Sequence, residues 1–156
     1  AGRRNLNIDI MQPSLVYLET DSGKLLEQVA LADEFHQSSI RHFDLSADGL
    51  ALVAMQYQGH KGDIVPLVAI HRRGEAMAEL PLPETVRSSL QQYCGSACFD
   101  RSGRFGAVSA PRGNKVMLWN MQTQTFLGAV KTRDGCGIAP TEKSGEVLVS
   151  TGLGRF

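Results

Sequence analysis

One local pattern occurs three times in this chain of 156 residues, and it limits the folds that the chain can adopt. Each copy is an extended segment, a polar turn closed by glycine, and a second segment with alternating apolar residues. The turn glycines are Gly49, Gly103 and Gly145, so 54 and 42 positions separate successive copies. Glycine suits these places because a tight hairpin needs a left-handed backbone conformation there. Repeats of this period predict β-propeller blades, each a four-stranded antiparallel sheet.

Period-two alternation and turn residues predict where the strands lie. The expected strands are residues 15–19, 25–31, 40–45, 50–57, 65–71, 76–82, 93–99, 105–110, 115–120, 126–131 and 147–151. Residues 83–92 differ, since Pro83 and the spacing that follows favour one or two helical turns. The chain is therefore expected to be all-β apart from this segment.

These strands amount to about three blades, whereas a closed propeller needs roughly four to eight. We expect one partial propeller domain over residues 1–156, with a half-blade at 13–32, blades at 39–82 and 93–131, and a half-blade at 136–151. An open arc exposes two sheet edges, which soluble proteins avoid. We therefore expect the missing part of a longer propeller, or a second copy of the chain, to cover those edges.

Composition narrows the classes of partner. Sixteen basic and sixteen acidic residues give a formal net charge of zero, which removes the usual argument for nucleic acid or an anionic membrane. Apolar runs stay well short of the roughly 18 residues that span a bilayer. Cys94, Cys98 and Cys136 are expected to be small core residues, because no partner histidine follows at metal-site spacing.

Antiparallel connectivity places the loops between blades and the loops after each second strand on one face. Gln58 and Arg112 each follow a hairpin glycine by nine positions, and Arg155 follows Gly145 by ten. We expect these side chains to form an arc of donors at the inner rim, where arginine suits carboxylate or phosphate. Alternatively, the arginines cap loop carbonyls or pair with Asp134 and Glu142.

The same face and the inner strands supply the other candidates. The expected ligand-binding residues are Arg41, His42, Gln56, Gln58, Tyr93, Arg112 and Arg155. His42 either lines the channel, where it could titrate, or is hydrogen-bonded within the strand packing. His36 and His60 could join it around a metal, but their spacing does not define a site. We assign no catalytic residue, no metal ligand and no cofactor, because the motifs of nucleophile elbows, zinc helices and phosphate loops are missing.

Several short stretches occur in the order found in one protein family: residues 5–9, 11–15, 39–42, 56–59, 111–113 and 150–152. They resemble a bacterial envelope family catalogued as domain of unknown function fifteen-thirteen (DUF1513), with WD40-like or YVTN-like repeats. The resemblance covers nearly the whole chain as the C-terminal half of a member. It implies a seven-bladed propeller of about twice this length, exported to the periplasm. It also implies a link to iron uptake, through neighbouring genes for imelysin-like envelope proteins.

Two functional hypotheses follow. The first is a cell-envelope module that binds or scaffolds a partner protein or a small anionic ligand. The second is a propeller enzyme or metal-dependent redox protein with its site at the channel mouth. The first is favoured because the sequence offers no set of acid, base and nucleophile.

Overall fold

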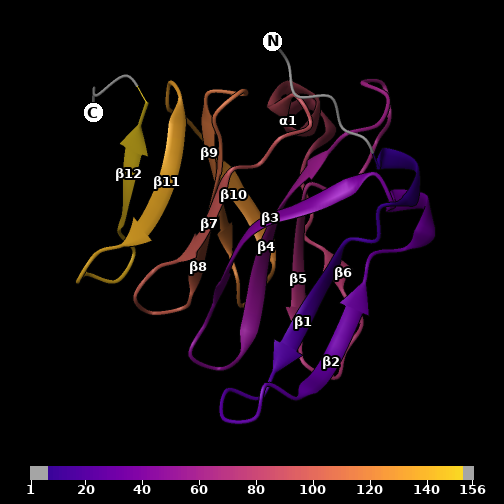
Figure 1. The fold of residues 1–156 in the computed structure, drawn as a ribbon. Helices are drawn as coiled ribbons and strands as arrows, with labels where there is room; N and C mark the ends of the chain where they lie inside the picture. The colour runs from indigo at the N-terminus through magenta and orange to yellow at the C-terminus, as the bar shows by residue number, and fades with distance from the viewer. Residues whose placement is uncertain (1–6, 153–156) are drawn as a thin grey trace.

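The computed structural model describes residues 7–152, and nearly all of its regular structure is β (Figure 1). Its strands are β1 (Ser14–Leu18), β2 (Leu25–Ala30), β3 (Ser38–Leu45), β4 (Leu50–Tyr57), β5 (Val68–Arg72), β6 (Ala78–Glu79), β7 (Ser96–Phe99), β8 (Phe105–Ala110), β9 (Lys115–Asn120), β10 (Thr125–Lys131), β11 (Gly135–Pro140) and β12 (Val147–Thr151). Helical turns are η1 (Ile8–Ile10), η2 (Asp33–Phe35), α1 (Glu84–Arg87) and η3 (Ser88–Leu90). Within the described part of the chain, no helix is long and apolar enough to cross a membrane.

The strands form four antiparallel sheets in chain order. Two are four-stranded, β3-β4-β5-β6 and β7-β8-β9-β10, and two are hairpins, β1-β2 and β11-β12. The first strands of successive sheets are neighbours, because β3 contacts β7 and β7 contacts β11. Figure 1 shows the sheets following one another from the β1-β2 hairpin on one side to β11-β12 on the other. This arrangement is compatible with propeller blades whose first strands line one axis.

Most of the expected strands are confirmed, and the differences have a local cause. The bounds of β4, β8, β9 and β12 are those that alternation predicts. The strand expected at 65–71 starts only at Val68, and the one expected at 76–82 is reduced to Ala78–Glu79. Pro66 and Pro81 interrupt these segments because proline has no N–H to donate to a ladder.

Two further segments differ from the expectation. The strand expected at 93–99 starts at Ser96, because Gln92 and Cys94 bond to the preceding sheet rather than to their own. β11 (Gly135–Pro140) was expected only as part of the last half-blade, since its glycines and proline favour strands poorly. The helical turns expected in residues 83–92 are confirmed as α1 and η3.

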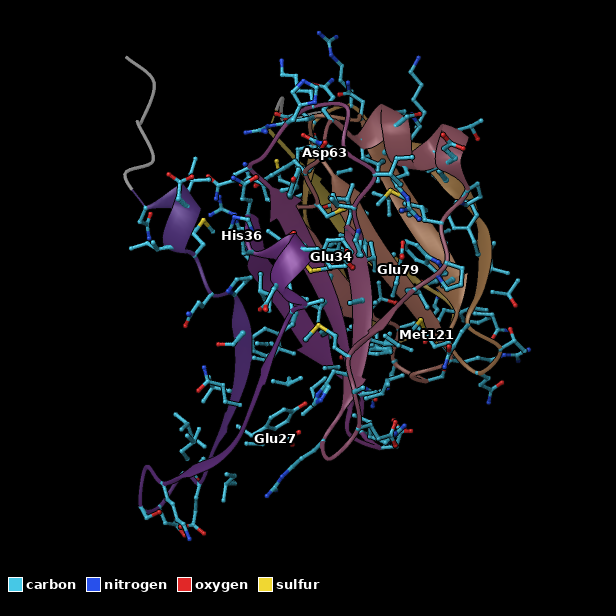
Figure 2. All side chains as sticks on the ribbon, turned by 90° about the vertical axis from the view of Figure 1, so that its right-hand side faces the viewer. Glu27, Glu34, His36, Asp63, Glu79 and Met121 are labelled. Atoms are coloured by element: carbon cyan, nitrogen blue, oxygen red, sulfur yellow. The ribbon has the colours of Figure 1, made fainter. Side chains whose placement is uncertain are left out.

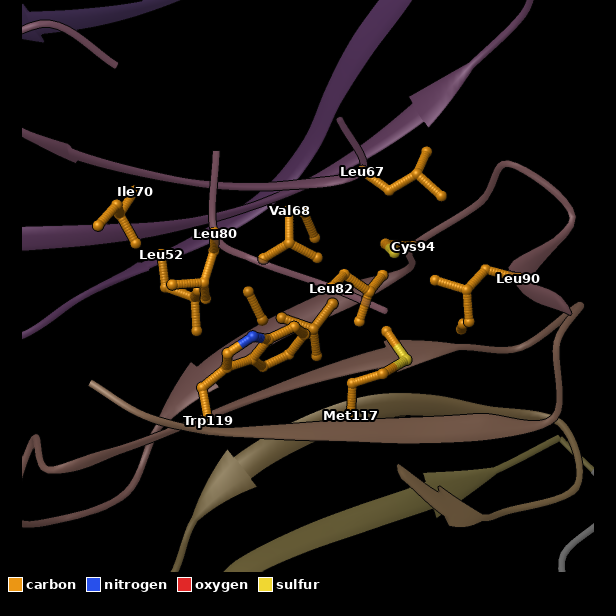
Figure 3. Packing of buried hydrophobic residues seen from close by; sticks show 14 of the residues in the cluster. Leu52, Leu67, Val68, Ile70, Leu80, Leu82, Leu90, Cys94, Met117 and Trp119 are labelled. Atoms are coloured by element: carbon orange, nitrogen blue, oxygen red, sulfur yellow. The ribbon is translucent and has the colours of Figure 1, made fainter. Parts of the chain in front are cut away.

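The main core lies between the two four-stranded sheets (Figure 3). Leu52 and Ile70 from the first sheet belong to one buried cluster with Met117 and Trp119 from the second. Trp119 is fully buried, and its indole N–H donates to the carbonyl of Pro81 at 2.8 Å. Burying side chains of this size contributes about 1.5 to 3 kcal/mol each. This cluster therefore fixes how the two sheets pack.

The other face of the first sheet is covered by the β1-β2 hairpin. Leu15 packs there in a second cluster with Ala51 and Val53 of β4. The hydroxyl of Tyr17 lies 2.8 Å from Nδ1 of the buried His71, whose Nε2 lies 2.9 Å from the carbonyl of Glu75. A carbonyl can only accept, so Nε2 carries the proton and Nδ1 accepts from Tyr17. The hairpin is thus tied to the sheet by both apolar and polar contacts.

The three repeated turns are similar but not identical, because the backbone bond that closes the turn spans four residues in the first copy and five in the other two. Ser46, Asp100 and Thr141 take equivalent places, and their N–H groups donate across the hairpin to Leu50, Phe105 and Glu146. Asp100 does more than the other two, since its carboxylate accepts from the N–H groups of Phe105 at 2.9 Å and Gly145 at 2.8 Å. Because Gly145 belongs to the next hairpin, Asp100 joins two successive sheets.

We expect Asp100→Ala to lower the free energy of unfolding by about 2 to 3 kcal/mol at neutral pH, since it removes the charged acceptor of the N–H groups of Phe105 and Gly145. Burial raises the pKa of the Asp100 carboxyl, but its hydrogen bonds from Ser102, Gly145 and Phe105 outweigh burial and leave the pKa below its ordinary value. This stabilisation is therefore present above the unfolded pKa of about 4 and is lost as pH falls through the folded pKa.

Urea unfolding followed by Trp119 fluorescence at pH 7 and pH 3 measures both effects. The exposed turn residue Asp21 provides the matched control, and Asp21→Ala should change the stability by less than about 0.5 kcal/mol. An equal loss in the two variants at pH 7 would contradict the role of Asp100.

Candidate functional site

A concavity of about 900 Å³ opens at the end of the molecule where α1 lies. Figure 2 places Asp63 at this end, whereas Glu27 lies toward the other. Its walls come from both four-stranded sheets: the end of β4, the loop at 58–67, the helical turns, and the loop after β8. The lining residues include Gln56, Tyr57, Gln58, Gly59, Lys61, Asp63, Glu84, Arg87, Gln91, Gln92 and Arg112.

A backbone junction between the two sheets includes Gln56, Tyr57 and Gln92 of the lining. The N–H of Tyr57 donates to the carbonyl of Gln92 at 3.0 Å, and the N–H of Cys94 donates to the carbonyl of Met55 at 2.9 Å. Gln56 and Tyr93 form an isolated antiparallel bridge in the same place. The next residue, Gly95, already bonds to Ser109 of its own sheet. The segment before β7 therefore pairs first with β4 and then with β8.

Two consecutive glutamines precede the segment that passes from β4 to β8 at this junction. Gln91 and Gln92 both have left-handed backbones, with φ of 52° and 53°, which is costly for residues other than glycine. Their side chains hold the loops on either side. The amide of Gln91 donates to the carbonyl of Arg112 at 2.9 Å, and that of Gln92 donates to the carbonyl of His60 at 2.8 Å. Strained residues held by their surroundings are typical of functional sites.

A second set of contacts shapes the loop at 58–63. The hydroxyl of Tyr57 donates to Oδ2 of Asp63 at 2.7 Å. This hydrogen bond, together with burial, raises the pKa of Tyr57 above its ordinary value. A Cβ on Gly59 would overlap the Tyr57 hydroxyl and the Gln37 amide, so glycine is needed for the close approach. The phenol is thus kept neutral and the loop is held against the sheet.

Two of the arginine candidates contact the bridged pair Gln56 and Tyr93. The guanidinium of Arg41 donates to the amide oxygen of Gln56, which is bridged to Tyr93. The guanidinium of Arg112 lies over the ring of Tyr93, 4.7 Å from its centroid. Both arginines are exposed, and within residues 7–152 neither forms an ion pair. The rim therefore presents two cations whose charges no described carboxylate neutralises.

The structure brings most of the sequence candidates together. Gln56, Gln58 and Arg112 line one concavity, and Arg41 and Tyr93 contact two of them. The sequence predicts the shared face of Gln58 and Arg112 from their equal distance to the hairpin glycines, and this is confirmed. Arg155 lies outside the described residues. His42 is exposed on β3 and is not among the residues that line the concavity.

The alternative roles considered for Arg112 are not observed among the described residues. Glu142 pairs instead with Arg101 at 3.3 Å. The carbonyl of Asp134 accepts from the N–H of Gly152 across the β11-β12 hairpin, and its carboxylate lies 3.7 Å from Sγ of Cys136.

The other candidates for chemistry lie apart. His36 and His60 each bond within their own turn, and residues 7–152 contain no group of three metal-ligating side chains of histidine, cysteine, aspartate or glutamate. Cys94 and Cys98 are buried free thiols, and burial raises their pKa values to about 12 and about 11. The expectation that these two are core residues is confirmed, while Cys136 is half-buried.

The sequence predicts Gln56 and Tyr93 of the junction as ligand-binding residues, but it does not select the two glutamines Gln91 and Gln92. Gln91 and Gln92 read as ordinary polar residues after a helical turn, and their left-handed backbones leave no signal in the sequence. Gly113 offers a weak signal as part of a turn. A Cβ there would lie 2.9 Å from the carbonyl oxygen of Ser89, so it allows the loop after β8 to approach η3 closely.

Comparison with known proteins agrees with this architecture. A family model described as "Protein of unknown function (DUF1513)" matches residues 1–156, so the chain belongs to that family. A chain of Kuenenia stuttgartiensis hydrazine synthase, a propeller-like protein, is similar with a TM-score of 0.67 and 16% sequence identity. The match covers 93% of this chain and 53% of that one, so this chain spans about half of its length. At this identity the similarity shows the fold alone, and no curated protein matches.

We expect Gln92→Gly to open the loop at 58–65 with little change in overall stability. Glycine removes the left-handed strain of roughly 1 kcal/mol, while the lost amide hydrogen bonds cost about as much. Hydrogen–deuterium exchange should therefore rise in peptides covering 58–65. Gln91→Gly is the matched control, because it should raise exchange at 111–114 instead. Equal exchange in both variants at both loops would show that the amides do not hold them.

Proposed function

We propose that this chain forms an arc of a β-propeller and that its loop-face concavity binds a small anion bearing carboxylate or phosphate groups. The observation that carries the proposal is the exposed guanidinium of Arg112, stacked on Tyr93 at the rim of the concavity without a described acidic partner. A guanidinium offers paired donors that match two oxygens of an anion. Stacking on an aromatic ring orients it while leaving those donors accessible.

The surrounding residues support an anionic ligand. Lys61 lines the same concavity and Arg41 lies beside its edge. The two glutamine amides are already used in holding the loops, so they shape the site rather than fill it. Of the acidic residues in the lining, Asp63 accepts from Tyr57, which leaves its charge partly satisfied. The exposed Glu84 also lines the concavity, so Lys61, Arg87 and Arg112 stand against Asp63 and Glu84, which leaves one positive charge in excess, and Arg41 adds another at the edge.

An enzymatic role has less support. The Tyr57–Asp63 pair is the nearest approach to acid–base chemistry in the lining, but Tyr57 has a raised pKa and stays protonated at neutral pH. A protonated phenol that donates to a carboxylate is neither a nucleophile nor a base. A binding module is therefore the better reading of this site.

The wider setting is proposed from the family. We propose that the protein is a bacterial periplasmic envelope component linked to iron uptake, as the sequence resemblance to this family implies. A full ring of seven blades with repeats of the WD40-like type is the corresponding architecture. The hairpin sheets at both sides of the arc and the similarity to a propeller-like protein of about twice the matched length support it.

We expect citrate and inorganic phosphate to bind to the protein in isothermal titration calorimetry, and glycerol not to bind. Arg112→Gln should weaken anion binding by roughly tenfold or more, since a charge-assisted hydrogen bond contributes about 1.5 to 3 kcal/mol. Binding should also weaken with added salt.

Arg104→Gln is the matched control, because Arg104 also stacks on an aromatic ring, 5.3 Å from the centroid of Phe105, but at the hairpin end. It should leave the affinity unchanged. Absence of binding by both anions, or an equal loss in both variants, would refute the proposed site. Binding of an acidic peptide but of neither small anion would point to a partner protein instead.

A further inference from the structure

The first strand of the first four-stranded sheet carries an extra residue beside the concavity. The register of β3 on β4 shifts between Ile40 and His42, so Arg41 has no partner of its own in the ladder. A bulge of this kind redirects a side chain away from the regular alternation, and it is common next to functional sites. Here the guanidinium of Arg41 contacts the amide oxygen of Gln56, which lines the concavity. The bulge therefore brings a cation of β3 to the edge of the site.

The contact with Arg41 also fixes how the Gln56 amide is turned. Arginine has only donors, so the atom of Gln56 that it contacts must be the oxygen. The NH₂ group of Gln56 is therefore turned away from Arg41, and within the described part of the chain it has no hydrogen-bond partner. Because Gln56 lines the concavity, these two N–H donors are available to a molecule bound there.

Arg112 belongs to the other member of the same bridge. Gln56 and Tyr93 form an isolated antiparallel bridge, and residues paired in this way have Cβ atoms about 5 Å apart. Arg41 contacts the first member of the pair, and the guanidinium of Arg112 lies 4.7 Å from the ring centroid of the second. The bridge therefore anchors two separate guanidinium groups on neighbouring residues.

Each of these guanidinium groups needs its own counter-charge. Among residues 7–152, no carboxylate forms an ion pair with Arg41 or Arg112. Of the acidic lining residues, Asp63 accepts from Tyr57 and Glu84 lies in α1. The two oxygens of a carboxylate match the fork of one guanidinium. A ligand with a single carboxylate would therefore leave the second guanidinium without a counter-charge.

We propose that the site selects a dicarboxylate, an anion with two carboxylate groups on a short chain. Arg112 binds one carboxylate, and Arg41 binds the other with the help of the Gln56 amide. The second contact is made within an already bound molecule, so it adds affinity without a second loss of translational freedom. Two phosphates fit less well, because they bring roughly three to four negative charges to a lining with few unpaired cations. This inference rests on the proposed anion site and makes Arg41 its specificity-determining residue.

Calorimetry with matched ligands tests the need for two charges. The probes are succinate, glutarate and adipate, each compared with its own monoamide at constant ionic strength. A monoamide keeps the length of the dicarboxylate but carries only one charge. We expect at least one member of the series to bind at least about tenfold more tightly than its monoamide, since a second charge-assisted contact is made. The best length then reports the spacing of the two guanidinium groups.

Variants separate the two arginines. Arg41→Gln should reduce the affinity for the dicarboxylate to that for the monoamide, while the monoamide and inorganic phosphate bind as before. Arg41→Lys keeps the charge and should restore part of the preference. Arg112→Gln should weaken the binding of all three ligands. Native Trp119 fluorescence in each variant shows that the fold is kept.

Arg73→Gln is the matched control, because it removes an equally exposed arginine charge far from the site. Arg73 precedes Gly74, whose N–H donates to Glu27, and Glu27 lies toward the opposite end of the molecule (Figure 2). This variant should leave every affinity unchanged.

Three results would overturn the inference. Equal affinity for each dicarboxylate and its monoamide, with both still dependent on Arg112, would leave the anion site standing but remove the selection for two charges. An equal loss of phosphate and dicarboxylate binding in Arg41→Gln would place both arginines around one anionic group. Absence of binding by every anion would refute the proposed function, and the inference with it.

Discussion

The structure depends on one requirement, that a four-stranded sheet of this kind be covered on both faces. β4 shows it most clearly, since Ala51 and Val53 face the first hairpin while Leu52 and Ala54 face the second four-stranded sheet. All four are almost completely buried. A strand with two apolar faces cannot remain at a surface without losing several kcal/mol of burial. The stacking of successive sheets follows from this requirement.

Hairpins could be predicted from the sequence because their signals are local. Alternating residues and a left-handed glycine define where a strand turns, and Gly49, Gly103 and Gly145 all have positive φ. The limits of strands were predicted less well where tertiary contacts determine them. The N–H of Met55 donates to the carbonyl of Leu67 beside Pro66, so the hydrogen bonds of the sheet continue beyond the regular strand, where alternation alone could not place its limit.

The candidate site was foreseen in part for the same reason. Equal spacing from the hairpin glycines brought Gln58 and Arg112 to one concavity, because repeated units place equivalent residues alike. The left-handed backbones of Gln91 and Gln92 could not be predicted from the sequence. They depend on the angle between two sheets, and no single repeat encodes that angle. The stacking of Arg112 on Tyr93 depends on those backbones, which carry Tyr93 to the rim.

The backbone junction at Tyr57, Gln92 and Cys94 has a consequence for how the molecule responds to occupancy. A ligand held between walls from two sheets gains its contacts only while those sheets keep their mutual angle. The bound ligand would then add RT ln(1 + [L]/Kd) to the free energy needed to separate the two sheets. The added resistance to heat or denaturant would be greatest at the interface between the sheets, where Trp119 is buried at some distance from the ligand. The fluorescence of Trp119 during unfolding would thus report whether the concavity is occupied.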